Sequence, residues 1–197
     1  MDIDNSLNQQ SLSEKIYNFR KTIPMIDGKT ILQKVLSPYQ VEEYLYRGKT
    51  NVTGDVYRAA DLAPFANNLE EAFKNVRLDY YVENKSLPGA YDGNDYVKAI
   101  EKGEDLYVLR FTTYASFTNN MYSKVNEYNK PPCTGTGFTA SSEHLIPEFN
   151  CSMKYDETLN QLGIEISGGA IFRIEPSGKE IMIGCWDDIE GHFMVLN

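Results

Sequence analysis

Apolar residues recur at helical spacing in the first part of the chain and follow strand-like patterns in the last third. In the first 45 residues, serines precede apolar runs and prolines interrupt them, which is typical of short helices. Ser37-Pro38 combines a capping residue with a proline at the first helical position. Helices are therefore expected from Ser11 or Ser13 to about Arg20, over 30–35, and from Ser37-Pro38 to about Tyr44.

Beyond this region the pattern favours strands, with a few helices between them. Tyr44–Gly48 (YLYRG) indicates a short strand closed by glycine, and LYVLRFTTY is dense in β-branched and aromatic residues. Helices are expected over 67–76, 94–102 and 119–128, and strands over 106–114, 137–142, 162–166, 170–174, 180–186 and 192–196. This order predicts an α+β fold with a helical N-terminal part (1–40) and a domain of two packed, mainly antiparallel sheets (41–197), arranged as one compact unit.

Composition and charge restrict the possible partners. The 197 residues carry 19 Lys and Arg against 28 Asp and Glu, a net charge of −9, so the chain is not expected to wrap nucleic acid. No apolar run approaches the length of about 18 residues that a membrane span needs, and the polar start lacks the pattern of a cleaved secretory signal. Three cysteines without a CxxC pair predict no zinc site, and no metal is expected.

Three short motifs carry candidate chemistry. Arg47 in Tyr-Arg-Gly offers a planar fork of donors that suits a phosphate, and Gly48 lets backbone approach a ligand. Phe-Thr-Ala-Ser-Ser, with Thr139 and Ser141, provides hydroxyl groups on a strand. Glu180 begins an apolar strand, where a carboxylate can project into a cleft and stabilise a sugar cation.

The order of these motifs resembles the Arg–Ser–Glu class of bacterial ADP-ribosyltransferase toxins. Members carry an Arg on an early strand, an aromatic-x-Ser-Thr-Ser strand and a late Glu, followed by a final Phe/Tyr-x-Val/Ile strand. Arg47, the 138–142 segment and Glu180 match these positions, and Phe193-Met194-Val195 matches the last strand. The resemblance covers roughly residues 41–197 and implies an NAD-binding cleft between the two sheets.

The resemblance also implies a division of roles among the residues. Arg47 and Gly48 would bind the NAD diphosphate, Ser141 or Thr139 would orient Glu180, and Glu180 would stabilise the oxocarbenium ion as nicotinamide leaves. Phe172 would lie in the target-recognition segment. The expected protein is a monomeric effector that uses NAD as co-substrate, modifies a protein acceptor and is exported without a cleaved signal.

Several departures from the family pattern leave alternatives open. The middle motif has Ala-Ser-Ser in place of Ser-Thr-Ser, and Gly178 occupies the position where members carry the acceptor-activating Glu or Gln. Because glycine cannot activate the usual acceptor, the chain would either use an acceptor of unusual type or hydrolyse NAD. The segment 111–116 is a rival hydroxyl motif, and Glu175 and Glu190 are rival carboxylates.

Two other classes of protein compete with this interpretation. A nuclease would need histidine for acid–base catalysis, and the chain has only His144 and His192. A non-catalytic module, such as an immunity or effector-binding protein, would suit the acidic charge and the 14 tyrosines. This second reading predicts that the chain does not bind NAD.

Overall fold

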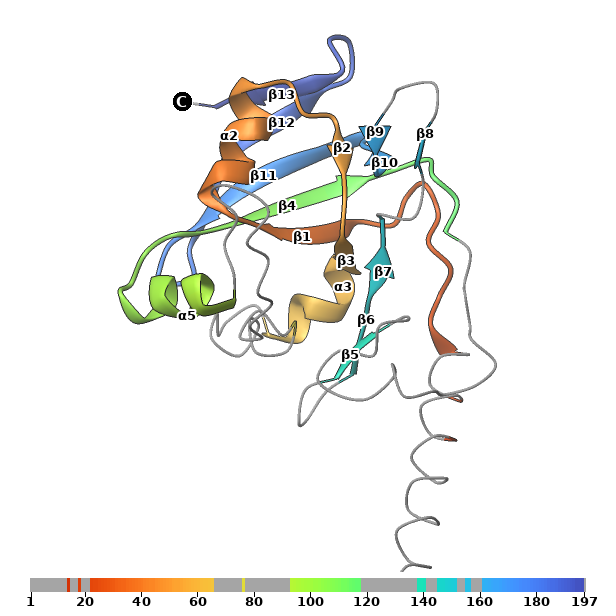
Figure 1. Cartoon of the computed structure of the whole chain (residues 1–197), viewed down its shortest axis with the longest axis horizontal. Coiled ribbons are helices and arrows are strands. Elements are labelled where there is room, and N and C mark those ends of the chain that lie inside the picture. The colour runs from red at the N-terminus through yellow and green to blue at the C-terminus, as the bar shows by residue number, and fades with distance from the viewer. Residues whose placement is uncertain are drawn as a thin grey trace, which may run out of the picture.

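A seven-stranded antiparallel sheet forms the centre of the molecule (Figure 1). The computed structural model describes residues 14, 18, 22–65, 76, 93–117, 138–140, 145–151, 155–156 and 161–196. The strands lie in the order β13-β12-β11-β4-β1-β3-β7. Their bounds are β1 Leu32–Leu36, β3 Asp55–Arg58, β4 Leu106–Thr112, β7 Phe149–Asn150, β11 Gly168–Ile174, β12 Glu180–Asp187 and β13 His192–Val195.

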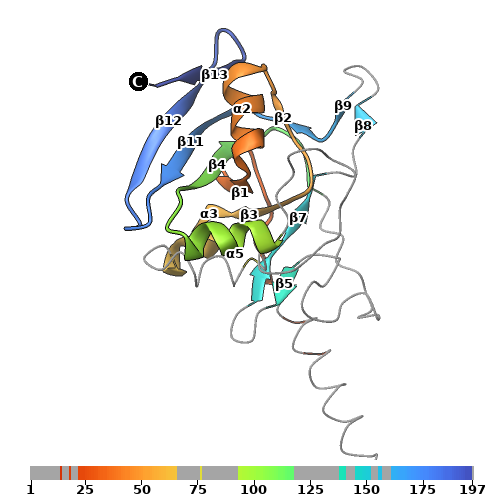
Figure 2. The same cartoon turned by 60° about the vertical axis from the view of Figure 1, so that its left-hand side comes forward.

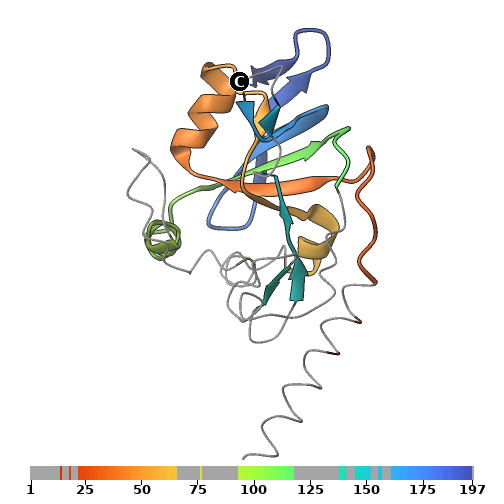
Figure 3. The ribbon, with the colours of Figure 1, turned by 45° about the vertical axis from the view of Figure 1, so that its right-hand side comes forward.

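Three pairs of short strands and a few short helices surround this sheet. The pairs are β2 (Asn51–Val52) with β10 (Ile164–Glu165), β5 (Phe138–Ala140) with β6 (Leu145–Pro147), and β8 (Tyr155–Asp156) with β9 (Gln161–Leu162). The helices are α2 (Pro38–Tyr46), α3 (Ala59–Leu62), a 3₁₀ turn (Ala63–Phe65) and α5 (Gly93–Glu101). The β5–β6 pair lies far from the β13 edge of the main sheet (Figure 3).

Strand β4 shows how the sheet separates its two faces. Leu109 and Phe111 belong to the larger core cluster, whereas Leu106 and Val108 belong to a second cluster. Successive residues of a strand point to opposite faces, so these two clusters cover opposite sides of the sheet. Arg110 therefore shares its face with Leu106 and Val108.

Helix α2 covers the first face at the β12–β13 end of the sheet (Figure 2). The Ser37 side chain accepts the Gln40 backbone N–H, and the Gln40 side chain accepts the Ser37 backbone N–H in return, which together form a capping box. Val41 and Tyr44 are buried in the larger core, where the Tyr44 ring meets Phe193 edge-to-face at 5.8 Å.

Helix α5 packs on the second face, away from α2 in every view (Figures 1–3). Its buried Tyr96 and Ala99 share the second cluster with Leu106, Val108 and Ile174. Gly103 follows the helix with a φ of 66°, which is the left-handed conformation expected just after a helix end.

The α+β class and the antiparallel sheets agree with the sequence pattern, and several elements are confirmed. The helix starting at Ser37-Pro38, the helix over 94–102, and the strands near 106–114, 170–174, 180–186 and 192–196 occur with small shifts of their ends. Of the strand expected over 137–142, the structure describes β5 (Phe138–Ala140), and the strand expected over 162–166 is divided into β9 and β10, which pair with different strands. The segments 67–76 and 119–128 and nearly all of the first expected helix lie outside the described residues.

Two predicted elements are wrong. Thr30–Val35 is not a helix, because Leu32–Leu36 forms β1, which pairs with both β3 and β4 inside the main sheet. Part of the segment expected as a helical extension thus belongs to the sheet. Tyr44–Gly48 is not a strand, because α2 continues through Tyr46 and ends at Arg47, just ahead of Gly48 with its φ of 69°.

Close packing at Gly169 generates a stability prediction. A Cβ atom there would lie 2.4 Å from the Arg110 carbonyl oxygen and 2.9 Å from Phe111 Cα, both of them backbone atoms in the centre of the sheet. Gly169→Ala should lower the free energy of unfolding by about 3 kcal/mol. Gly178→Ala is the matched control, since its φ of 83° strains alanine by about 1 kcal/mol but nothing lies within 4 Å of the added atom. Urea unfolding followed by circular dichroism measures both losses, and equal losses would contradict this packing.

Candidate functional site

Glu180 is held by an arginine from a strand two places away in the sheet. It is the first residue of β12, directly after the turn in which the Gly178 N–H donates to the Glu175 carbonyl oxygen at 2.8 Å. The Arg110 guanidinium donates to both carboxylate oxygens, with Nη1–Oε2 at 2.6 Å and Nη2–Oε1 at 2.5 Å. This two-pronged pairing is the strongest geometry available to an Arg–carboxylate pair.

Two further side chains orient the guanidinium. Arg110 Nε donates to Gln33 Oε1 at 2.8 Å, and the guanidinium carbon lies 4.9 Å from the centre of the Phe172 ring. Gln33, Arg110, Phe172 and Glu180, termed the Arg110 cluster below, come from β1, β4, β11 and β12, which are consecutive in the sheet. A donor fork, an aromatic face and a carboxylate thus meet on one rigid surface.

The pair is partly shielded from solvent. The Arg110 and Glu180 side chains are 28% and 35% exposed. The hydrogen bonds from Arg110 hold the pKa of Glu180 below its usual range, against the opposing effect of partial burial. Glu180 is therefore a carboxylate at neutral pH, in an environment less screened than open solvent.

The structure brings together only part of the site predicted from the sequence. Glu180 and Phe172 meet in the Arg110 cluster, but Arg47 does not join them. Arg47 ends α2, where it is exposed, lies 3.4 Å from Glu42 and stacks at 5.1 Å over the Tyr39 ring. Because α2 covers the face opposite to Arg110, the expected approach of Arg47 to Glu180 is not observed.

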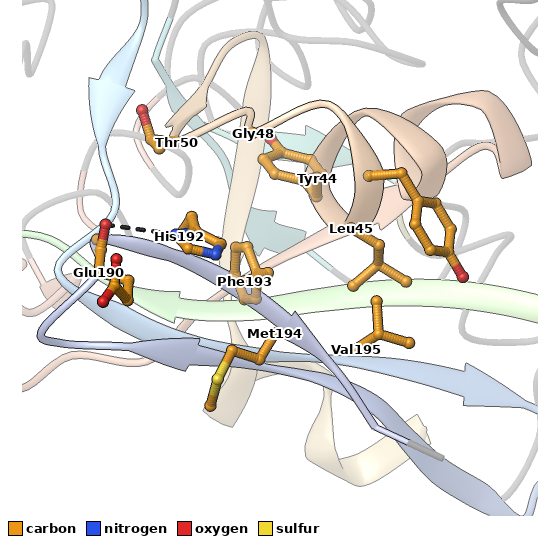
Figure 4. A pocket seen from close by; sticks show the side chains of 11 residues that line it. Tyr44, Leu45, Gly48, Thr50, Glu190, His192, Phe193, Met194 and Val195 are labelled. Atoms are coloured by element: carbon orange, nitrogen blue, oxygen red, sulfur yellow. Dashed lines mark hydrogen bonds between the residues drawn. The ribbon is translucent and has the colours of Figure 1, made fainter.

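Gly48 instead lines a groove between α2 and β13 (Figure 4). His192 and the rival carboxylate Glu190 line the same groove, and His192 Nδ1 lies 3.3 Å from the Glu190 carbonyl oxygen. Glu190 occupies the turn between β12 and β13, as the sequence predicted. The other rival carboxylate, Glu175, lies 3.8 Å from Arg173.

The hydroxyl motifs occupy different places in the fold. Thr139 lies in β5, where its backbone pairs opposite Ile146, and Ser141 lies outside the described residues, as does His144. In the rival segment 111–116, Thr112 Oγ1 lies 3.2 Å from Ser167 Oγ, on the same face as Arg110 but farther along β4.

Sequence reasoning missed Arg110 and Gln33. The signal for Arg110 was present, because a single arginine interrupts the apolar run LYVLRFT of a central strand. Such an arginine must reach a partner to offset the cost of partial burial. Its partner is 70 positions away in the sequence, so only the strand order reveals the pair.

Comparisons with known proteins provide no relative. No family model, curated protein or solved structure matches the chain. Within the described residues, no group of three or more His, Cys, Asp or Glu side chains is placed to hold a metal ion. No helix in that part of the chain is long and apolar enough to cross a membrane.

The Arg110–Glu180 pair predicts a specific acid sensitivity. A glutamate whose folded-state pKa lies below its unfolded-state value stabilises the fold above that unfolded value and loses this contribution as the pH falls through the folded-state pKa. The stability difference between wild type and Glu180→Gln should therefore shrink from about pH 5 downward. Urea unfolding at a series of pH values measures this stability difference. In an Arg110→Met background, the change in unfolding free energy caused by Glu180→Gln should not depend on pH. If this change is independent of pH in the wild-type background as well, the result argues against the Arg110–Glu180 pairing.

Proposed function

We propose that this chain cleaves the bond between nicotinamide and ribose in NAD, with Glu180 as the catalytic carboxylate. The supporting observation is the Arg110 cluster, in which an ionised carboxylate, an arginine fork and an aromatic ring share one sheet face. NAD offers a matching set of groups: a diphosphate for arginine, ribose hydroxyls for a carboxylate, and flat rings for an aromatic side chain. The binding cleft would lie over this face, beside α5.

Glu180 would act mainly through its charge. Departure of nicotinamide breaks the C1′–N bond, and the leaving group takes the bonding electron pair and becomes neutral. The ribose left behind is oxocarbenium-like, and a fixed carboxylate near it lowers the energy of this transition state. An acceptor then bonds to C1′ and releases a proton.

Arg110, in place of Arg47, is the arginine that this proposal assigns to the diphosphate. In the free protein Arg110 neutralises Glu180, which would weaken stabilisation of a cation. A bound diphosphate offers Arg110 a second anion, so the guanidinium can exchange partners while Glu180 turns to the ribose. Arg110 then pairs with the diphosphate, and Glu180 accepts hydrogen bonds from the ribose hydroxyls until the positive charge develops on the ribose.

The residue at position 178 bears on the identity of the acceptor. Gly178 lies in the β11–β12 turn with a φ of 83°, so no side chain is present where members of the resembled class carry an acceptor-activating group. Water is then the simplest acceptor, which makes an NAD glycohydrolase one form of the proposal and transfer to a protein the other. The resemblance implies an effector acting in a target cell.

Incubation of the purified protein with NAD, with nicotinamide followed by chromatography, tests the proposal. Wild type should release nicotinamide, and Glu180→Gln should lower the rate about a hundredfold or more while circular dichroism stays unchanged. Arg110→Lys should reduce kcat/KM about tenfold, because lysine cannot bind an anion with two prongs. Glu175→Gln, in the neighbouring turn, should retain the wild-type rate.

The Arg47→Ala variant tests whether Arg47 or Arg110 binds the diphosphate. Loss of activity in this variant, with Arg110→Lys fully active, would return the diphosphate role to Arg47 and contradict the assignment to Arg110. The ratio of free ADP-ribose to released nicotinamide identifies the acceptor, since a ratio of about one indicates water. If wild type neither releases nicotinamide nor binds NAD by calorimetry, the proposal is wrong, and the result favours a non-catalytic partner-binding protein.

A further inference from the structure

The groove between α2 and β13, termed the α2–β13 groove below, is a second surface on the face opposite to the Arg110 cluster. It has a volume of about 710 Å³ and opens to solvent; Figure 4 shows the side chains that line it. Phe193 and Val195 point from β13 toward Tyr44 and Leu45 of α2, while Met194 points the other way. The groove is lined by Tyr44, Leu45, Tyr46, Gly48, Thr50 and residues 190–195.

Large apolar side chains remain exposed in and beside this groove. Tyr46 is 69% exposed and Val195 is 41% exposed, and Met194 and Leu196 are also exposed. Tyr46 at the end of α2 and Val195 on β13 line the same groove, whereas Met194 lies on the other side of β13. Contiguous apolar groups of this kind on a protein surface commonly mark an interaction site.

The backbone of β13 offers hydrogen bonds in the same place. β13 is the last strand of the main sheet, and the Leu196 N–H donates inward to the Ile183 carbonyl oxygen of β12 at 2.9 Å. Because the direction of these groups alternates along a strand, Val195 directs its N–H and C=O away from β12. Neither group has a hydrogen-bond partner among the described residues. Phe193 faces the same way but is only 1% exposed, so the accessible edge starts at Val195.

The charge around the groove is acidic. Glu190 lines it, Asp188 lies in the same β12–β13 turn, and Asp187 is the last residue of β12, just before that turn. Asp187 already accepts the backbone N–H groups of Ile189 and Glu190, at 2.7 and 3.0 Å. The lining residues include no lysine or arginine. The adjoining Arg47 and Lys49 are paired with Glu42 and Glu43, so the remaining charge is acidic and suits a cationic partner.

We propose that the α2–β13 groove binds an extended, basic segment of a partner protein, which adds to the sheet at Val195. One residue of the segment forms two backbone hydrogen bonds with Val195, and this edge pairing is a recurrent mode of peptide recognition. An apolar side chain of the segment packs against Tyr46, and a lysine or arginine lies beside Glu190. This assignment is independent of any NAD chemistry.

Fluorescence anisotropy with a labelled short peptide of alternating lysine and valine tests the proposal, and a glutamate–valine peptide is the probe control. Wild type should bind only the lysine peptide, more weakly as salt increases. Val195→Pro removes the outward N–H and leaves the inward ladder to β12 intact, so it should weaken binding about tenfold with unchanged circular dichroism. Val195→Ala, the matched variant that keeps the N–H, should weaken binding less than about threefold.

Two further variants keep the test decisive if Val195→Pro unfolds. Tyr46→Ser should weaken binding by removing the apolar contact, and Glu190→Lys should weaken it and abolish the salt dependence. Lack of saturable binding by wild type, equal binding of both peptides, or unchanged binding by Tyr46→Ser and Glu190→Lys would each overturn the proposal. Sedimentation experiments provide one more outcome that would overturn the proposal. If wild type and Val195→Ala form a dimer and Tyr46→Ser does not, the groove is occupied by a second copy of the chain.

Discussion

The register of β4 between β1 and β11 determines which side chains each face of the main sheet carries. Leu109 lies opposite Lys34 on one side and Ile171 on the other, and Arg110 lies opposite Gln33 and Ala170. A shift of one residue would move Arg110 into the larger core and expose Leu109. Burial of Leu109 and Phe111 in the larger core therefore fixes the position of Arg110 on the opposite face.

This register also accounts for the reach of Arg110 to Glu180. The residue opposite Arg110 on β11 is Ala170, whose small side chain leaves room above the sheet. The Arg110 side chain extends through this room, over the Phe172 ring, to β12. Gln33 fixes Nε at the other end of the guanidinium. The orientation is thus set by three neighbouring strands, so little conformational entropy is lost when the fork binds an anion.

The sequence predicted elements well where local pattern and final structure agree, as for β11, β12 and β13, whose β-branched and apolar runs are separated by turns that contain Gly178 and Gly191. It failed at Leu32–Leu36 because Ile31, Leu32 and Val35 fit a helical spacing as well as a strand. The deciding interaction is pairing with residues 106–112, more than 70 positions away. It failed again at Arg47 because the Ser37 capping box starts a helix long enough to include Tyr44 and Tyr46.

The same contrast between local pattern and long-range pairing applies to the candidate site. Glu180 was identified because it begins a recognisable apolar strand, and Phe172 because it precedes Glu180 in the chain, whereas Arg110 joins them only through strand order. A motif search that assigns the arginine by its distance along the chain therefore selects Arg47, whose partners Glu42 and Tyr39 lie within its own helix. The nearest sequence neighbours of an arginine say little about its partners when the fold is an antiparallel sheet.

Strand β12 connects the two proposed surfaces. Glu180 at its start belongs to the Arg110 cluster, and Cys185 to Asp187 at its end pair with β13. Between them Gly184 lets Leu45 of α2 pack closely, because a Cβ atom at that position would lie 2.4 Å from Leu45 Cδ2. A paired strand fixed in this way transmits little displacement, and communication between sites needs an element with two alternative arrangements. None is evident in the part of the chain that the structure describes, so binding at Val195 and chemistry at Glu180 are expected to be energetically independent.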